Sequence, residues 1–226
     1  RVSFDLGPVE KIEYAKDPAG WQSKKYNDGG WSQAKQIVLG LPKGVFQSDL
    51  SWMLIPRILP QVELTTQRLQ TVRSVTGISL PAAFPSVTTS FTIPANTSVT
   101  ILLDNGVLTN AYPALQFSKG KDAQISLGYA EALYIEENDN KHWKSQNKKG
   151  NRNEIKGKRF VGVKDEFIAD GTDRETFTPL SWRTYRYMQV AIKTADEPLT
   201  IDDLSGIFPG YPLELKAKVT VDNETL

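Results

Sequence analysis

The chain has 226 residues, with 27 Lys and Arg against 26 Asp and Glu, so its formal net charge is +1. This balance provides no overall field that would favour nucleic acid or an anionic membrane. The absence of cysteine and the single histidine, His142, exclude disulfide frameworks, thiolate zinc sites, thiol catalysis and two-histidine metal sites. The glycine-rich pieces match neither a dinucleotide-binding pattern nor a P-loop, so we expect no cofactor and no metal.

The N-terminal part of the chain opens on Arg1 without a charged-then-apolar leader, as expected of a mature protein or an excised piece. Residues 18–44 mix Trp21, Tyr26 and Trp31 with polar residues and glycine, which is typical of a long loop with aromatic packing anchors. The chain has no apolar run of 18 residues, so we expect no membrane-spanning segment.

Alternation of apolar and polar residues is the dominant pattern from residue 62 onward, and it predicts β-strands. The expected strands are residues 62–72, 87–93, 99–104, 114–118, 123–129, 188–192 and 215–221. The 188–192 strand carries few strongly polar residues and is expected to be buried on both faces. Lys119-Gly120-Lys121 lies between two alternating runs and predicts a hairpin turn. No long amphipathic helix stands out, so we predict an all-β fold, an antiparallel β-sandwich or jelly roll.

A second long loop is expected over residues 136–158, which are almost wholly polar. Its basic residues are Lys141, Lys144, Lys148, Lys149, Arg152, Lys156 and Lys158. One interpretation is a contact for a polyanion or an acidic sugar. The alternative, which we favour, is a solvated insertion between two strands.

Carboxylates at strand ends are the candidates for catalysis or cation binding. Glu131 follows a predicted strand and is a conceivable acid for glycoside hydrolysis, but a strand-end contact with a neighbouring loop explains it better. Asp104 and Asn105 offer oxygen ligands for Ca²⁺. The calcium-loop pattern is absent, however, so a plain turn is the preferred interpretation.

Aromatic side chains are the more informative candidates, because sugar rings stack their C–H faces on exposed aromatic rings while polar side chains bond to the hydroxyls. Trp143 lies within the polar 136–158 loop, without alternating apolar partners. Trp182, Arg183 and Tyr185 stand together at the entry to a predicted strand. We take these four residues as the candidate carbohydrate-binding set. The alternative for the 182–187 cluster is structural, with arginine stems packed over rings in the core.

The order of short motifs along the chain resembles the β-sandwich region of bacterial α-L-rhamnosidases of glycoside hydrolase family 78, especially exported enzymes of Bacteroides-type bacteria. The matching positions are Asp104 and Gly106; Tyr129, Glu131 and Leu133; Asn151 and Arg152; Asp165 and Phe167; Phe177 and Thr178; and Arg186 and Tyr187. Upstream, residues 52–60 resemble the family's W-x-L-x-P-R-x-I-P element, and the Trp21 to Trp31 segment resembles one common in galactose-binding-like sandwiches.

The resemblance implies a galactose-binding-like accessory domain over residues 1–226, with 1–40 as a possible part of a neighbouring domain. The family's catalytic carboxylates lie in an (α/α)₆ barrel that would follow residue 226, so no catalytic residue is transferred to this chain. The implied partners are that barrel and a rhamnose-containing oligosaccharide, and the implied location is periplasmic or secreted. The alternatives are an independent carbohydrate-binding module and a polyanion-binding adhesion module that uses the basic run.

Overall fold

The computed structural model describes residues 9–18, 20–37, 40–41, 52–53, 55–135, 149–214 and 216–222. These residues divide into two compact units. The first draws on Arg1–Asp17 and Glu63–Gly210, and the second on Pro18–Val62 and Tyr211–Leu226. The single domain expected over residues 1–226 stays a prediction. No helix in the described ranges has the length and apolar character to cross a bilayer.

The first unit is built from strands. They are β1 (Lys11–Glu13), β4 (Glu63–Gln67), β5 (Thr71–Thr76), β6 (Phe91–Ile93), β7 (Ser98–Lys119), β8 (Gln124–Ala130), β9 (Tyr134–Ile135), β10 (Lys158–Arg159), β11 (Val163–Ile168), β12 (Glu175–Phe177), β13 (Arg183–Lys193) and β14 (Leu199–Gly210). In the described part of the chain, the single helical element is the short 3₁₀ turn η1 (Tyr14–Lys16). Among its described residues, the second unit contains the strand pair β2 (Gly40–Leu41) with β3 (Trp52–Met53). The all-β fold class is therefore confirmed.

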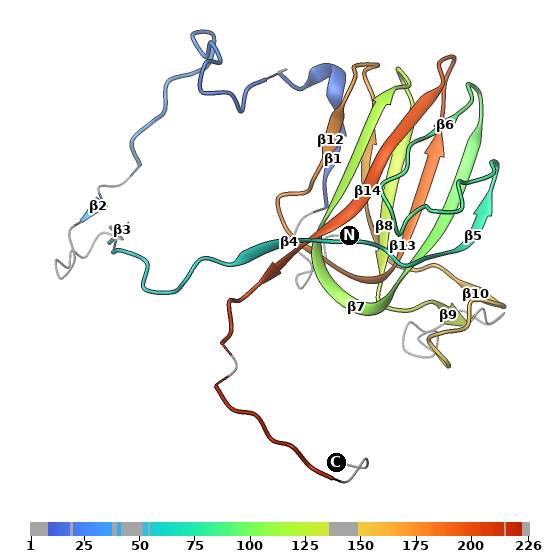
Figure 1. The fold of residues 1–226 in the computed structure, drawn as a ribbon. Coiled ribbons are helices and arrows are strands. Elements are labelled where there is room, and N and C mark those ends of the chain that lie inside the picture. Colours follow the sequence, from blue (N-terminus) through green and yellow to red (C-terminus); the bar gives the residue numbers. More distant parts are fainter. Residues whose placement is uncertain are drawn as a thin grey trace, which may run out of the picture. The chain divides into compact units, whose positions relative to one another are not determined.

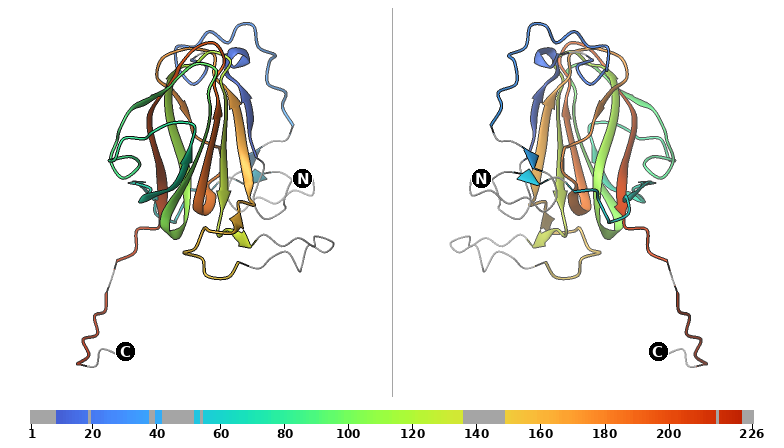
Figure 2. Two further views of the ribbon diagram at one scale, coloured as in Figure 1. Left: turned by 90° about the vertical axis from the view of Figure 1, so that its right-hand side faces the viewer. Right: turned by 90° about the vertical axis from the view of Figure 1, so that its left-hand side faces the viewer.

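Strand β7 organises the sandwich, because it belongs to both of its layers. Its first part pairs with β13 on one side and β5 on the other, while its last part pairs with β14 and β12. Between the two parts the strand curls, and Gly106 takes a φ of 81° there. Figure 1 shows β7 turning back at one end of the sandwich, and Figure 2 gives the side views. The predicted strands 99–104 and 114–118 are thus two parts of one continuous strand.

The first layer runs in the order β1, β11, β8, β13, β7 and β5, and the second joins β12, β7, β14, β4 and β6. Nearly all pairs are antiparallel, as expected. The exception in this unit is β1, which runs parallel to β11 and makes the sheet mixed. An edge strand that enters from a distant part of the chain does not need a hairpin, so its direction is free.

Alternating apolar side chains fill the space between the two layers. On β13, Met188, Val190 and Ile192 are buried, whereas Gln189 and Ala191 on the other face are only half-buried. The prediction that this strand is buried on both faces therefore holds only at its start, where Tyr187 on the outer face is fully buried. Phe117, Phe167 and Phe177 from three different strands meet in this core. The Phe167 ring stacks on that of Phe177 at 4.5 Å and lies 5.6 Å from that of Phe117. Burying one such side chain contributes about 1.5–3 kcal/mol.

A turn does form at Lys119-Gly120-Lys121, with a positive φ at Lys119 and Gly120. The predicted hairpin is wrong, however, because β7 and β8 do not pair with each other: the end of β7 pairs with β14 and β12, and β8 pairs with β11 and β13. The strand predicted over 215–221 is wrong for its described residues, 216–221, which form no strand. Val219 is 84% exposed. Alternation produces a strand only where a neighbouring strand accepts the hydrogen bonds, and no such pairing forms within the described residues. The strand expected over 87–93 is shorter, covering only Phe91–Ile93.

A smaller apolar cluster lies on the outer face of the first layer. It contains Leu102, Ala130, Leu133 and Tyr187, with Ile155 and Phe160 packed against them. Leu102 alternates with core residues on β7, so its side chain must leave the layer on the opposite face. The segment around residues 149–160 therefore covers one end of this outer face.

Candidate functional site

The structure separates the residues of the candidate carbohydrate-binding set. Trp143 lies outside the described residues. Trp182 is 53% exposed, whereas Arg183 and Tyr185 are only 2% and 1% exposed. The latter two side chains alternate into the core at the start of β13, and only Trp182 presents a ring to solvent.

Trp182 stands beside a second aromatic residue from β7. Its ring meets that of Tyr112 edge-on, with centroids 6.2 Å apart and an interplanar angle of 81°. Two polar residues of the same strand pair lie close by in the sequence, and the Thr184 hydroxyl donates to the Asn110 side-chain oxygen at 2.6 Å. An exposed indole braced by a second ring, with hydroxyl and amide groups near it, is suited to a sugar ring. Tyr112 and Asn110 were not singled out from the sequence, because they lie beyond the curl of β7.

Arg183 is held inside the sandwich by a carboxylate. Its Nε and Nη2 donate to the two oxygens of Asp165 at 2.9 and 2.7 Å, and Asp165 is fully buried. The backbone N–H of Glu10 also donates to Asp165, at 2.8 Å. The Arg183 guanidinium lies 5.8 Å from the Tyr129 ring centre. Burial and the neighbouring Asp165 charge raise the pKa of Tyr129 well above its ordinary value.

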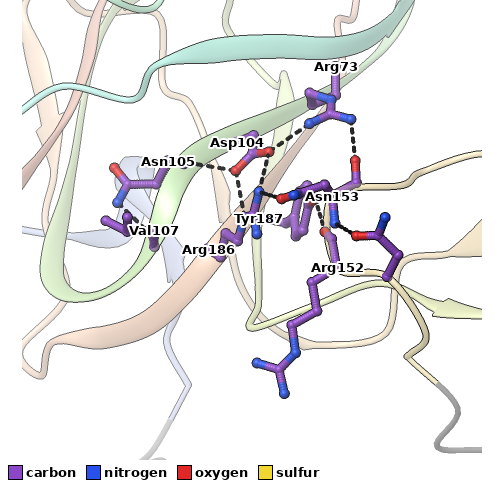
Figure 3. Close-up of polar contacts among 10 residues, drawn as sticks. Arg73, Asp104, Asn105, Val107, Arg152, Asn153, Arg186 and Tyr187 are labelled. Carbon is purple, nitrogen blue, oxygen red and sulfur yellow. Dashed lines mark hydrogen bonds and ion pairs between the residues drawn. The ribbon is translucent and has the colours of Figure 1, made fainter. Parts of the chain in front are cut away.

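A second buried carboxylate, Asp104, lies where β7 begins to curl (Figure 3). Arg73 Nη1 donates to it at 2.9 Å, Arg186 Nε at 3.0 Å, and the N–H of Gly106 at 2.8 Å. Burial on its own would raise the pKa of Asp104. The hydrogen bonds from Arg186 and Gly106 and the two positive charges outweigh burial and lower that pKa. Asp104 therefore stays ionised and joins three strands.

The same network attaches the 149–160 segment to the sandwich. Arg73 Nη2 donates to the Asn153 carbonyl and Arg186 Nη2 to the Asn153 side-chain oxygen, each at 2.6 Å. The Tyr187 hydroxyl donates to the carbonyl of Arg152. Figure 3 shows both guanidinium groups directed at Asp104. Asp104 thus has a structural role, because both of its oxygens accept hydrogen bonds from Arg73, Arg186 and the N–H of Gly106.

Glu131, the conceivable catalytic acid, is half-exposed at the end of β8. Its carboxylate lies 3.6 Å from the Lys149 ammonium. This is the strand-end contact with a neighbouring loop that the sequence favoured. Across the described ranges, no three His, Cys, Asp or Glu residues gather in a way that could hold a metal ion.

A hollow on the outer face of the first layer was missed from the sequence. It has a volume of about 460 Å³ and crosses β1, β11, β8, β13 and β7. At its centre Ser126 pairs in register with Ala191, and Ala191 with Thr100. The sequence does contain small or hydroxyl side chains at the outward positions of three strands. These positions are far apart in the chain, so only the strand register shows that they are neighbours.

Neither a protein-family model nor a curated protein matches the sequence. Among solved structures, the GH78 family rhamnosidase of Bacillus sp. GL1 is similar at 13% identity and a TM-score of 0.41, over 58% of this chain and 12% of that chain. The rhamnosidase from Klebsiella oxytoca with rhamnose bound also gives 13% and 0.41, over 66% and 30%. The CBM32-1 and CBM32-2 domains of Clostridium perfringens ZmpB in complex with GalNAc give 10% and 0.36, over 68% and 41%. The chain thus spans less than half of each of these structures, and at such TM-scores they assign no function.

Proposed function

We propose that this chain is a non-catalytic, extracytoplasmic accessory β-sandwich of an α-L-rhamnosidase that braces the catalytic barrel of its parent enzyme. The proposal is supported by the structural role of the residues that carry the family resemblance. Asp104, Arg186 and Tyr187, which carry part of the family resemblance, lie in one framework network at the curl of β7. Asp165, another of them, is sealed in the core with Arg183.

These interactions support a scaffold role, because a catalytic carboxylate must reach a substrate. General acid catalysis requires a carboxyl group within hydrogen-bond distance of the reacting oxygen. The oxygens of Asp104 and Asp165 instead accept bonds from arginines and backbone N–H groups. The hydrolysis of rhamnosyl bonds is therefore assigned to the barrel expected beyond residue 226.

The test has two arms. The purified 226-residue chain is assayed with p-nitrophenyl α-L-rhamnopyranoside, and no turnover is expected. The parent reading frame is then sequenced beyond Leu226, where a region of paired helices with acidic motifs is expected. Turnover that disappears in Glu131→Gln, or a reading frame without such a region, would contradict the proposal. A Glu154→Gln variant serves as the control for loss of an acid near this end of the sandwich.

A second candidate function is carbohydrate binding by the chain itself, at the surface formed by Trp182 and Tyr112. The exposure of Trp182 favours it, since an indole that is 53% exposed leaves a face free for a sugar ring. The neighbouring Asn110 and Thr184 carry no charge, which suits a neutral sugar such as rhamnose or galactose.

Titration calorimetry with rhamnose, galactose and pectic oligosaccharides tests this second function. We expect Trp182→Ala to remove the heat of binding and Tyr112→Ala to weaken it. Trp31 is the matched control, because it is 50% exposed and its ring also contacts a tyrosine, Tyr26, at 5.5 Å. Binding that survives Trp182→Ala, or that is lost in Trp31→Ala, would contradict this assignment.

A further inference from the structure

The hollow on the outer face of the first layer has a regular construction. One row across the strands runs through Lys11, Glu166, Ser126, Ala191 and Thr100, each paired in register with the next. The small side chains of the last three residues form the floor. The long side chains of Glu166 and Lys11 stand beyond Ser126 on one side of this floor, and the row continues past Thr100 to Thr76 of β5 on the other.

The next row supplies further polar groups. Gln124 pairs in register with Lys193, and Lys193 with Ser98, and all three line the same hollow. The lining thus offers hydroxyl, amide and ammonium groups to one ligand. Its volume, about 460 Å³, falls in the range of pockets that hold small ligands.

The charges around the hollow favour an anionic ligand. Lys11 and Lys193 are both exposed, and within the described residues neither forms an ion pair or a side-chain hydrogen bond. The two acids beside Lys11 are already paired, Glu166 with Lys164 at 2.5 Å and Glu13 with Lys16. Lys11 on β1 and Lys193 on β13 are three strand spacings apart, roughly 14 Å. Lys11 therefore stands beyond the Ser126 side of the floor, and Lys193 stands at one end of it, two residues along β13 from Ala191.

We propose that this hollow is a binding site for a short acidic oligosaccharide, whose uronate carboxylates pair with Lys11 and Lys193 while its hydroxyls bond to Ser126, Thr100 and Gln124. The ligand lies across the strands. Hydrogen bonds from these polar side chains to sugar hydroxyls would suit any sugar. The preference for an acidic sugar comes from the positive charges of the two lysines. The site is separate from the Trp182 surface, and it does not depend on the function proposed there.

The experiment measures binding of trigalacturonate and of neutral galactotriose by calorimetry, at low and at high salt. Trigalacturonate is expected to bind more tightly, and its affinity is expected to fall as salt screens the two lysines. Lys11→Gln and Lys193→Gln should each weaken it about three- to fivefold, as for exposed ion pairs. Ala191→Phe should abolish binding by filling the floor. Because Ala191 faces outward, the thermal midpoint of unfolding of Ala191→Phe should match that of the parent chain, which would show that the fold is kept.

Lys156→Gln is the matched control, because Lys156 is exposed and does not line the hollow. This variant is expected to bind trigalacturonate like the parent chain. The proposal is overturned if trigalacturonate gives no heat at millimolar concentration, if galactotriose binds equally well, or if the lysine variants match Lys156→Gln. It is also overturned if Trp182→Ala abolishes trigalacturonate binding, since the acidic sugar would then occupy the other surface.

Discussion

Asp165 and Arg183 form a two-bond ion pair inside the sandwich, between β11 and the first residue of β13. Nε lies 2.9 Å from one carboxylate oxygen and Nη2 lies 2.7 Å from the other, and both side chains are buried. Two strands that are not neighbours in the layer are joined in this way across β8. The pair therefore bears on the stability of the fold rather than on contact with a ligand.

Removing one partner of this pair is expected to destabilise the protein strongly. Arg183→Met leaves the Asp165 carboxylate buried without its counter-charge, which costs about 3–5 kcal/mol. Urea unfolding followed by circular dichroism measures the change in the free energy of unfolding. The double variant Asp165→Leu with Arg183→Met should be less unstable than Arg183→Met alone, because no buried charge remains. A single variant within about 1 kcal/mol of the parent would refute a structural role for the pair.

The Asp104 network should make the free energy of unfolding depend on pH in the acid range. The folded-state pKa of Asp104 lies below its ordinary value, so the carboxylate stabilises the fold at neutral pH. This contribution is lost as the pH falls below about 4, through the folded-state pKa. We expect Asp104→Asn to lower the free energy of unfolding by about 2–3 kcal/mol at pH 7. The difference from the parent should shrink as the pH is lowered towards 2.5.

Asp173→Asn is the control for the Asp104 prediction. Asp173 also pairs with a basic residue, Lys119, at 3.0 Å, but both side chains are about 60% exposed. Exposed pairs contribute at most about 1 kcal/mol. If Asp173→Asn and Asp104→Asn gave the same loss and the same pH profile, the Asp104 network would have no special role.

Tyr185 and Gly206 approach each other closely across the core. A Cβ atom at Gly206 would lie 2.7 Å from the Tyr185 hydroxyl and 3.2 Å from the Ala111 Cβ. Gly206→Ala should therefore cost about 1–3 kcal/mol through overpacking. In a Tyr185→Phe background the same change should cost less, since the nearest atom is gone. Thermal unfolding measures both costs.

The control for this pair is Gly30→Ala, because nothing lies within 4 Å of a Cβ at Gly30. It should leave the midpoint of unfolding nearly unchanged. Equal costs of Gly206→Ala in the two backgrounds would show that the tyrosine hydroxyl does not fill this space.

The sequence predicted the strands of the core well, because their alternation is enforced by burial on one face. Residues 123–129 correspond closely to β8, and the Lys119-Gly120-Lys121 turn lies where expected. It could not predict that β7 stays one strand through Asn105 and Gly106, since the curl depends on pairing with strands from later in the chain. The same limit applies at 215–221, where alternation is present and no partner strand pairs with the described residues.

For the candidate site, the sequence correctly marked the 182–187 region as rich in aromatic and guanidinium groups. It could not decide which of them face solvent. That depends on which face of β13 enters the core, and Arg183 enters because Asp165 on β11 neutralises it. Tyr112 and the floor around Ala191 were missed, because only strand register brings them next to Trp182 and Ser126.

Phe160 holds the 149–160 segment against the first layer. A Cβ at Gly128 would lie 2.9 Å from its ring, so the ring lies directly over this glycine. Phe160→Ala should release the segment while costing only about 1–2 kcal/mol of global stability, since the ring is half-buried. Limited trypsin digestion, read by mass spectrometry, should show faster cleavage after Lys156 and Lys158.

Gly128→Ala provides an independent check of this contact, because its methyl group would displace the same ring without removing it. We expect it to speed cleavage at the same two lysines. Phe167→Ala is the control for a loss of global stability. Phe167 lies in the main core, so this change should lower the free energy of unfolding by about 3–5 kcal/mol. Unchanged cleavage in both Phe160→Ala and Gly128→Ala would mean that the Arg73, Arg186 and Asn153 bonds are sufficient to hold the segment.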